Sequence, residues 1–225
     1  MKGALGLLAL WIAWAALHSL LMTPAAKAWF RRLLGRGFAF YRLGFNLLAL
    51  ATFASAALLA PRLPEPVYVL SPPWFWAGRL LQALGLGLLV WTFLVIDGRE
   101  FLGLRQVHDF FLHGPPPDES GERPTRLTVS GPYALCRHPM YLAGFLVLFA
   151  EPGMSLEHLL FSLFAGGYFL LGSVFEERRL VRAFGDAYVQ YQRRTPRFFP
   201  LSFPRKVVER GPSKRAGPRR PFGDS

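Results

Sequence analysis

The sequence has a single cysteine, Cys136, and few acidic side chains, 14 against 26 lysines and arginines. One cysteine excludes an intramolecular disulfide and a metal site built from several thiolates. Charged residues of both signs make up only 18% of the chain, whereas hydrophobic residues make up 52%. The net charge of +12 indicates an anionic partner, and the positions of the basic residues decide which kind.

Long hydrophobic runs are abundant. Three of them are 17 or 18 residues long: Leu5–Leu21, Leu43–Ala60 and Leu80–Ile96. Helices of this length are near the minimum that crosses the ~30 Å of hydrocarbon in a bilayer. These runs exclude an ordinary soluble enzyme and a disordered chain, and they predict an integral membrane protein.

Two further apolar stretches, Met140–Ala150 and Leu159–Phe175, are separated by a Pro-Gly pair that breaks a helix. This pattern predicts a helical hairpin with a tight turn at Glu151–Leu156. Its two open ends, near His138 and near Glu176, then lie at the same membrane surface. The predicted fold class is all-α and integral to the membrane, with about five transmembrane helices, of which the last two form the hairpin.

Basic residues are concentrated in three segments. Five lie between the first two apolar runs, five between Ile96 and Pro139, and thirteen after Phe175. Loops rich in lysine and arginine stay in the cytoplasm. Five spans therefore predict an N-terminus outside and a cytoplasmic C-terminus, in a bacterial inner membrane. Cleavage of the first run as a signal peptide would leave the basic Trp29–Arg42 segment outside, which the charge rule disfavours.

The chain divides into three predicted segments. Residues 1–60 form an N-terminal two-helix membrane segment, and residues 74–200 form a membrane core. Residues 201–225 hold four prolines, seven basic and two acidic residues, which is typical of a flexible basic tail. We expect this cytoplasmic tail to meet anionic membrane lipids rather than nucleic acid.

The segment Gly131–Gly144 carries the most chemistry. It begins with a Gly-Pro turn, and a helix is expected to start at or after Pro139. His138 and Tyr141 are three residues apart, so they share a helix face. Together with Arg137 they are either anchors at the membrane boundary or part of a ligand site, and the residue types leave both open.

Two adjacent carboxylates, Glu176 and Glu177, follow the last apolar run. The end of a helix disfavours negative charge, so a cation should compensate them. The neighbouring Arg178 and Arg179 can do this locally, and a ligand with a positive group is the alternative.

These segments together resemble a known superfamily. The order Gly-Pro-Tyr-x3-Arg-His-Pro-x-Tyr-x2-Gly, hydrophobic hairpin, Glu-Glu and Phe-Gly-x2-Tyr-x2-Tyr-x3-Thr-Pro is similar to the isoprenylcysteine carboxyl methyltransferases and phospholipid N-methyltransferases. The resemblance covers about Thr125–Pro200. Those proteins are membrane methyltransferases that use S-adenosylmethionine. Two further stretches, Leu94–Val107 and Met154–Phe161, are similar to the bacterial methanethiol S-methyltransferase branch.

The resemblance implies a cytoplasmic cofactor pocket in the membrane core. It assigns S-adenosylmethionine to Thr125, Arg126, Leu127, Thr128, Tyr133, His138, Pro139, Met140, Tyr141 and Glu176. Arg137 and His138 are the candidate catalytic residues. Aromatic rings suit the sulfonium of this cofactor, and charged side chains suit its amine and carboxylate. No metal is expected.

The acceptor is expected to be a small thiol such as methanethiol. Gly172 occupies the position of an arginine that the prenylcysteine enzymes use for their substrate. Arg99 and Arg105 are the candidate substrate residues, because cations near a thiol favour the reactive thiolate. A lipid or a prenylcysteine stays as the alternative acceptor.

A second alternative is a membrane protein of another class. The first two spans and the Trp29–Arg42 connection are similar to bacterial nitrite and nitric oxide reductase accessory proteins. In that case His18 would be the natural ligand of a haem.

Overall fold

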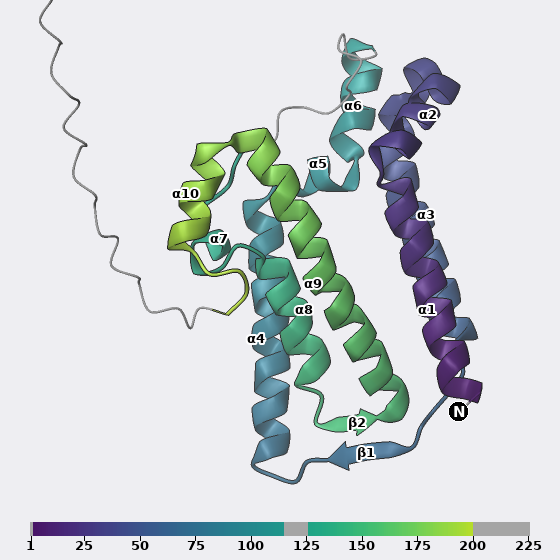
Figure 1. Cartoon of the computed structure of the whole chain (residues 1–225), viewed down its shortest axis with the longest axis vertical. Coiled ribbons are helices and arrows are strands. Elements are labelled where there is room, and N and C mark those ends of the chain that lie inside the picture. Colours follow the sequence, from purple (N-terminus) through teal and green to yellow (C-terminus); the bar gives the residue numbers. More distant parts are fainter. Residues whose placement is uncertain (1, 115–125, 200–225) are drawn as a thin grey trace, which may run out of the picture.

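The computed structural model describes residues 2–114 and 126–199 (Figure 1). Its helices are α1 (Lys2–Leu21), α2 (Pro24–Leu34), a 3-10 helix (Gly35–Phe40), α3 (Tyr41–Leu59), α4 (Trp74–Val95), α5 (Gly98–Leu102), α6 (Leu104–His113), α7 (Pro132–Leu135), α8 (Pro139–Phe149), α9 (Leu156–Phe184) and α10 (Asp186–Arg194). Two short strands, β1 (Pro66–Val69) and β2 (Gly153–Ser155), complete the described part of the chain.

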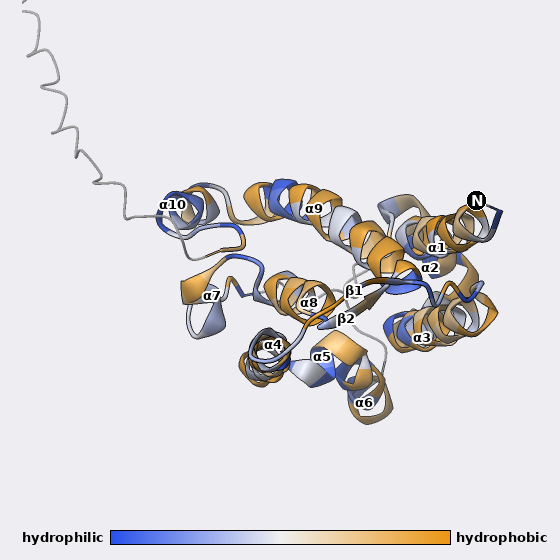
Figure 2. Ribbon diagram, turned by 90° about the horizontal axis from the view of Figure 1, so that it is seen from below, coloured by the Kyte–Doolittle hydropathy of each residue, from blue (hydrophilic) through white to orange (hydrophobic). Residues whose placement is uncertain are grey.

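The fold is helical, and its long helices are those of an integral membrane protein. Within the described residues, four apolar helical stretches are long enough to cross a membrane. They are α1, α4, α9 and the stretch Pro24–Leu59, which runs from the start of α2 to the end of α3. The fifth predicted span, α8, has only 11 residues and packs between α4 and α9 (Figure 2). Leu58 of α3 and Leu94 of α4 are more than three-quarters exposed, which suits faces that contact lipid.

The predicted hairpin is formed by α8 and α9. Ser155 caps the start of α9 by accepting a hydrogen bond from the backbone of His158. The His158 ring then donates from Nε2 to the carbonyl of Leu148 on α8, over 2.9 Å. At 29 residues, α9 is about 43 Å long, so it reaches well beyond the hydrocarbon layer.

The connection between α8 and α9 is not the simple tight turn that the sequence predicts. Strand β2 pairs antiparallel with β1, which lies in the connection between α3 and α4. Both connections have backbone N–H and C=O groups outside helices, and the pairing joins these groups to one another. The contact is long-range, which explains why neither segment shows a strand pattern by itself.

A stripe of small residues joins α4 to α8. Gly78, Gly85 and Thr92 are the buried residues of α4 and lie seven positions apart. A Cβ atom on Gly85 would come within 2.9 Å of the Leu146 side chain on α8. Small residues at this spacing allow two helix backbones to approach closely inside a membrane.

The N-terminal helices pack against the first half of α9 through aromatic rings. Trp11 of α1 lies 4.7 Å from Phe161 of α9, measured between ring centroids, and both contact Phe53 of α3. His18 stacks on Trp14 with 5.1 Å between ring centroids.

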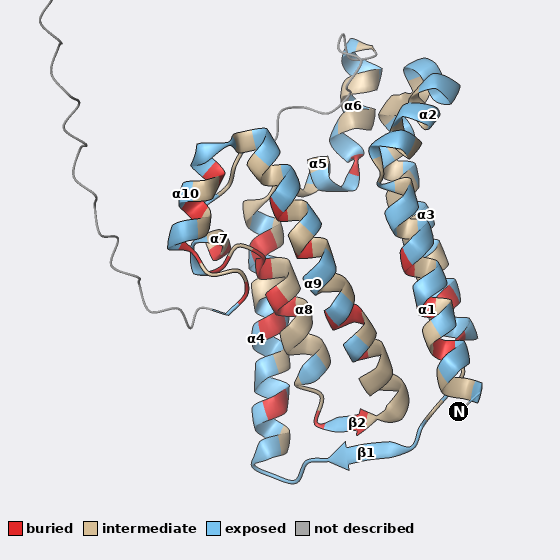
Figure 3. Cartoon of the chain, in the orientation of Figure 1, coloured by how far each residue is buried: buried red, intermediate tan, exposed pale blue. Residues whose placement is uncertain are grey.

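The two ends of the molecule are formed by different helices and strands. Strands β1 and β2 lie at the same end as the N-terminus, and α2, α5, α6 and α10 lie toward the opposite end (Figure 1). A cluster of buried residues lies where α7, α8 and α10 come together (Figure 3).

Candidate functional site

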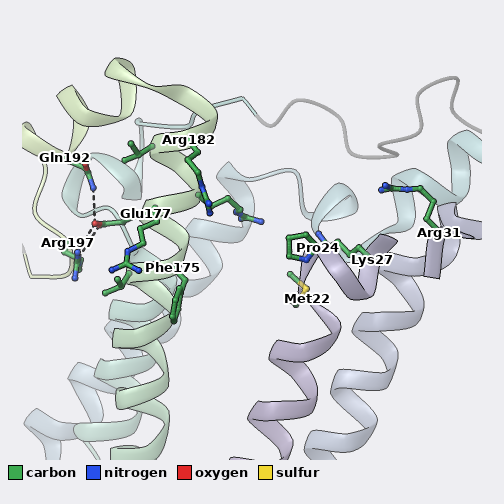
Figure 4. A pocket seen from close by; sticks show the side chains of 13 residues that line it. Met22, Pro24, Lys27, Arg31, Phe175, Glu177, Arg182, Gln192 and Arg197 are labelled. Carbon is green, nitrogen blue, oxygen red and sulfur yellow. Dashed lines mark hydrogen bonds and ion pairs between the residues drawn. The ribbon is translucent and has the colours of Figure 1, made fainter. Parts of the chain in front are cut away.

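Glu177 of α9 is the centre of the buried cluster. Its side chain is only 6% exposed and accepts hydrogen bonds from Arg137 Nε at 2.8 Å and Arg197 Nη2 at 2.9 Å. Gln192 donates a further hydrogen bond from Nε2 at 3.0 Å (Figure 4). The His138 ring lies 3.2 Å from the same carboxylate through its Nε2. A buried carboxylate requires this many partners to offset the loss of water.

Arg137 connects the motif to the segment that follows α10. Its Nη1 donates to the carbonyl oxygens of Gln192 and Thr195, at 3.1 and 2.6 Å. The backbone N–H groups of Arg137 and His138 donate to the carbonyls of Pro196 and Arg197. The guanidinium is therefore bonded on all sides to protein groups, which favours a positioning role for Arg137.

Glu176 differs from its neighbour because its side chain is 37% exposed. The hydroxyl of Tyr141 donates to its Oε2 at 3.2 Å, and the Nδ1 of His138 lies 3.4 Å from the same oxygen. Both partners come from the predicted motif, so the structure brings together His138, Tyr141 and Glu176 as the sequence suggested. The Glu176 side chain is therefore held by the motif and remains partly open to its surroundings.

Three rings form a stack beside Glu176. His138 and Tyr141 are parallel within 4°, with 5.2 Å between their centroids. Phe169 of α9 continues the stack on the other side of Tyr141 with the same spacing and tilt. A row of ring faces beside a carboxylate is a favourable surface for a cationic group.

His138 holds its proton more strongly than an ordinary histidine. Burial favours the neutral ring, but hydrogen bonds and charge from Glu176 and Glu177 outweigh it and raise the pKa of His138. The protonated ring can donate to both carboxylates at once. His138 is thus a link between the exposed and the buried glutamate.

One tyrosine of α10 holds the turn before α8, and a second tyrosine of α10 is buried. Tyr191 donates from its hydroxyl to the carbonyl of Tyr133 at 2.6 Å, and Tyr188 is 1% exposed. Gly131 starts the turn with a φ of 61°, which favours glycine. Burial, with the nearby charge of Glu176, raises the pKa of Tyr133 to about 12, so its phenol stays neutral.

Cys136 lies inside the motif without access to solvent. It is 0% exposed, and burial raises the pKa of its thiol to about 11. A neutral buried thiol is a poor nucleophile, which supports a packing role for this residue.

The remaining predicted cofactor positions lie before α7 and at the start of α8. Arg126, Leu127 and Thr128 precede α7 outside any helix or strand, and Pro139 and Met140 begin α8. Thr125 lies outside the described residues.

The predicted substrate residues are on α5 and α6. Arg105 forms an ion pair with Asp97, whose side chain also caps α5. Among the described residues, neither Arg99 nor Arg105 forms a hydrogen bond or ion pair with the Glu176–Glu177 cluster. Their substrate role stays a prediction.

The buried cluster also depends on three residues that the sequence did not assign to a site: Glu177, Gln192 and Arg197. The Glu-Glu pair and the Thr-Pro pair that precedes Arg197 were both visible as motifs. Residues 40 or 20 positions apart meet in this cluster only after the chain has folded, so their pairing had no local signal.

Comparison with known proteins defines the class of the chain. Methanethiol S-methyltransferase 2 of Bradyrhizobium diazoefficiens is 30% identical over 192 residues, which cover 85% of this chain and 71% of that protein. Methanethiol S-methyltransferase of Mycobacterium tuberculosis is 33% identical over 196 residues, covering 83% of this chain and 73% of the other. No protein-family model and no solved structure matches.

A shorter match lies outside the methyltransferases by name. The cobalt-zinc-cadmium resistance protein CzcN of Cupriavidus metallidurans is 36% identical over 84 residues, or 36% of this chain and 38% of that protein. The long matches decide the class: this is a helical membrane protein of the methyltransferase type. More particularly, the chain belongs to the methanethiol S-methyltransferase family.

Proposed function

We propose that this protein transfers the methyl group of S-adenosylmethionine to a small thiol such as methanethiol. Membership of the family supports the reaction class. The observation that carries the site is the exposed carboxylate of Glu176, which His138 and Tyr141 hold beside a stack of three rings. An exposed anion next to aromatic faces is what a cationic cofactor needs.

The residues of the cluster fit the chemistry of this cofactor. S-adenosylmethionine supplies an electrophilic methyl group on a positively charged sulfur. Glu176 would bind its amine or ribose hydroxyls, and the ring faces of Tyr141 and His138 would lie toward its positive charge. Tyr133, Pro139, Met140 and the 126–128 segment would form the remainder of the cofactor site, with Thr125 as a further predicted member.

Glu177 and Arg137 have a different proposed role. Their ion pair is buried. It connects the turn before α8 with α9, and Arg137 also binds the carbonyls of Gln192 in α10 and of Thr195 after it. It holds His138 in place, and His138 in turn orients Glu176. Catalysis by positioning needs this rigidity, because methyl transfer requires donor and acceptor to be in line.

The acceptor is proposed to be small because of Gly172. A Cβ atom at this position would lie 3.5 Å from the Tyr141 hydroxyl, so Gly172 borders the proposed site. Gly172 has no side chain that could bind a carboxylate. The resemblance implies that the prenylcysteine enzymes use an arginine at this position.

The chemical step is a direct displacement. Bound S-adenosylmethionine would supply the methyl group, which would pass directly to the thiolate and leave neutral S-adenosylhomocysteine. A thiol with a pKa near ~8.5 is partly ionised at neutral pH, so no strong base is required. His138 is proposed to act on the cofactor side, through its contact with Glu176.

The experiment uses the purified full chain in detergent. Calorimetry should detect binding of S-adenosylhomocysteine. Methyl transfer from S-adenosylmethionine is then measured in parallel with methanethiol, N-acetyl farnesylcysteine and phosphatidylethanolamine. We expect turnover with methanethiol. Turnover with only the prenylated or lipid acceptor would overturn the thiol assignment, and absence of binding would overturn the cofactor assignment.

A further inference from the structure

Tyr168 lies on a stripe of α9 that leads to the proposed cofactor site. Tyr168, Gly172 and Glu176 are four residues apart, so they follow one another along the helix, and each step turns by about 40°. Tyr168 faces α1, where its hydroxyl meets Ser19, and Glu176 faces α8, where its carboxylate meets Tyr141. Gly172 therefore points between these two directions.

A small group fits beside Gly172. A Cβ atom at this position would lie 3.5 Å from the Tyr141 hydroxyl, which is an ordinary contact distance. The glycine thus leaves space of about one methyl group between the Tyr168 side of the stripe and the Glu176 side.

The Tyr168 hydroxyl can donate a hydrogen bond to a third group. Its oxygen lies 3.0 Å from the hydroxyl oxygen of Ser19, which is in the last turn of α1, and the pair is exposed. Either hydroxyl can donate to the other. When Ser19 donates, the hydrogen of Tyr168 remains for a ligand, because each hydroxyl has one hydrogen and two lone pairs.

Aromatic rings surround the Tyr168 side chain. Its ring stacks on Phe164 with 6.3 Å between centroids, and it lies 6.3 Å from Trp14 and 6.4 Å from His18. Sulfur makes favourable contacts with aromatic rings, and a methyl group suits the same apolar surface. One hydroxyl donor among ring faces matches the chemistry of a small thiol.

We propose that the Tyr168 hydroxyl binds the sulfur of the acceptor thiol and holds it beside Gly172. The inference rests on the proposed methyl transfer and names the residue that recognises the acceptor. A thiol that has lost its proton to water accepts the hydrogen bond, and the phenol keeps its own proton. The hydrogen bond to the charged sulfur is strong, and it weakens when methylation makes that sulfur neutral, which favours release of the product.

Steady-state kinetics of the purified full chain in detergent can test this role. Tyr168→Phe removes the hydroxyl but keeps the ring that packs against Phe164. We expect KM for methanethiol to rise about tenfold, because a hydrogen bond to a charged group is lost. The affinity for S-adenosylhomocysteine, measured by calorimetry, should not change. An unchanged KM in Tyr168→Phe would overturn the inference.

Ser19→Ala is the matched control. It removes the same hydrogen bond between α1 and α9 but leaves the Tyr168 hydroxyl in place. Its KM for methanethiol should stay close to that of the wild type. Equal increases of KM in the two variants would assign the hydroxyl pair to helix packing and reject the acceptor role. Absence of transfer to methanethiol in the wild type would reject the proposed function and this inference with it, whereas an active wild type with an unaffected Tyr168→Phe rejects only the role of Tyr168.

Gly172→Ala tests the position of the acceptor. The added methyl group would occupy the space beside the bound thiol without a clash in the protein. We expect kcat/KM to decrease more for propanethiol than for methanethiol, because the longer thiol needs more of this space. Equal decreases for the two thiols would place the acceptor away from Gly172.

Discussion

At the scale of single residues, two adjacent glutamates have opposite environments. Consecutive residues of an α-helix point about 100° apart, so Glu176 and Glu177 cannot face the same surroundings. Glu177 turns toward Arg137 and Arg197 and is nearly fully buried, whereas Glu176 stays partly exposed beside Tyr141. One carboxylate can thus stabilise the fold while the other is available to a ligand.

This division predicts the behaviour of Glu176→Gln. The variant should fold normally but bind S-adenosylhomocysteine ten- to a hundredfold more weakly, because a charged hydrogen bond contributes ~1.5–3 kcal/mol. Calorimetry measures the affinity, and thermal unfolding in detergent checks the fold. Glu157→Gln is a suitable control, because this carboxylate binds Arg62 at the other end of α9. Unchanged affinity in Glu176→Gln would remove this residue from the cofactor site.

The raised pKa of His138 predicts a dependence of stability on pH. A group whose pKa is higher in the folded state contributes fully below its ordinary value of 6.5 and loses this contribution as pH rises through the folded value. The melting temperature of the wild type should therefore fall as pH increases above 6.5. In His138→Gln this decrease should be smaller, because the titrating ring is absent. Parallel pH curves for the two proteins would contradict the assignment.

At the scale of elements, close contact between α4 and α8 positions the start of the motif. Helix α8 begins at Pro139, directly after His138, and is held along α4 by Gly78, Gly85 and Thr92. Any change that separates these two helices should therefore move His138 away from its carboxylate partners.

Two glycines of α4 allow a matched test. Gly85→Leu should destabilise the protein by about 1–3 kcal/mol, because the new side chain would collide with Leu146 and the backbone of Ala143. Gly87→Leu has open space around its Cβ and should be tolerated. Unfolding temperature in detergent is the measurement. Equal effects of the two substitutions would show that helix packing at Gly85 is not close.

At the scale of the whole molecule, the chain has two chemically distinct ends. The helices α2, α5, α6 and α10 and the last turns of α9, which carry Glu176, lie toward one end, and the β1–β2 pair is at the other. This arrangement agrees with the proposed orientation, in which the loops rich in arginine face the cytoplasm. S-adenosylmethionine would then enter from the cytoplasm.

Single introduced cysteines test this orientation. In a Cys136→Ala background, an impermeant maleimide should label Ser71→Cys in intact spheroplasts, because this exposed residue lies near β1. Ala187→Cys, exposed on α10, should be labelled only after lysis. Labelling of position 187 but not of 71 before lysis would invert the proposed topology.

Much of this fold could be predicted from hydrophobic length and motif order. The apolar runs, the α8–α9 hairpin and the meeting of His138 with Glu176 depend on local composition and on one short connection. Helix length and the hydrophobic effect act on contiguous residues, so a sequence shows them directly.

Only the tertiary structure decided which groups are buried and which are available. The pairing of β1 with β2, the exposure of Glu176 beside the buried Glu177, and the contact of Ser19 with Tyr168 all depend on contacts between distant segments. The reason is physical: burial, hydrogen bonding and ion pairing follow from distances in space, and residues 20 to 149 positions apart acquire those distances only when the helices pack.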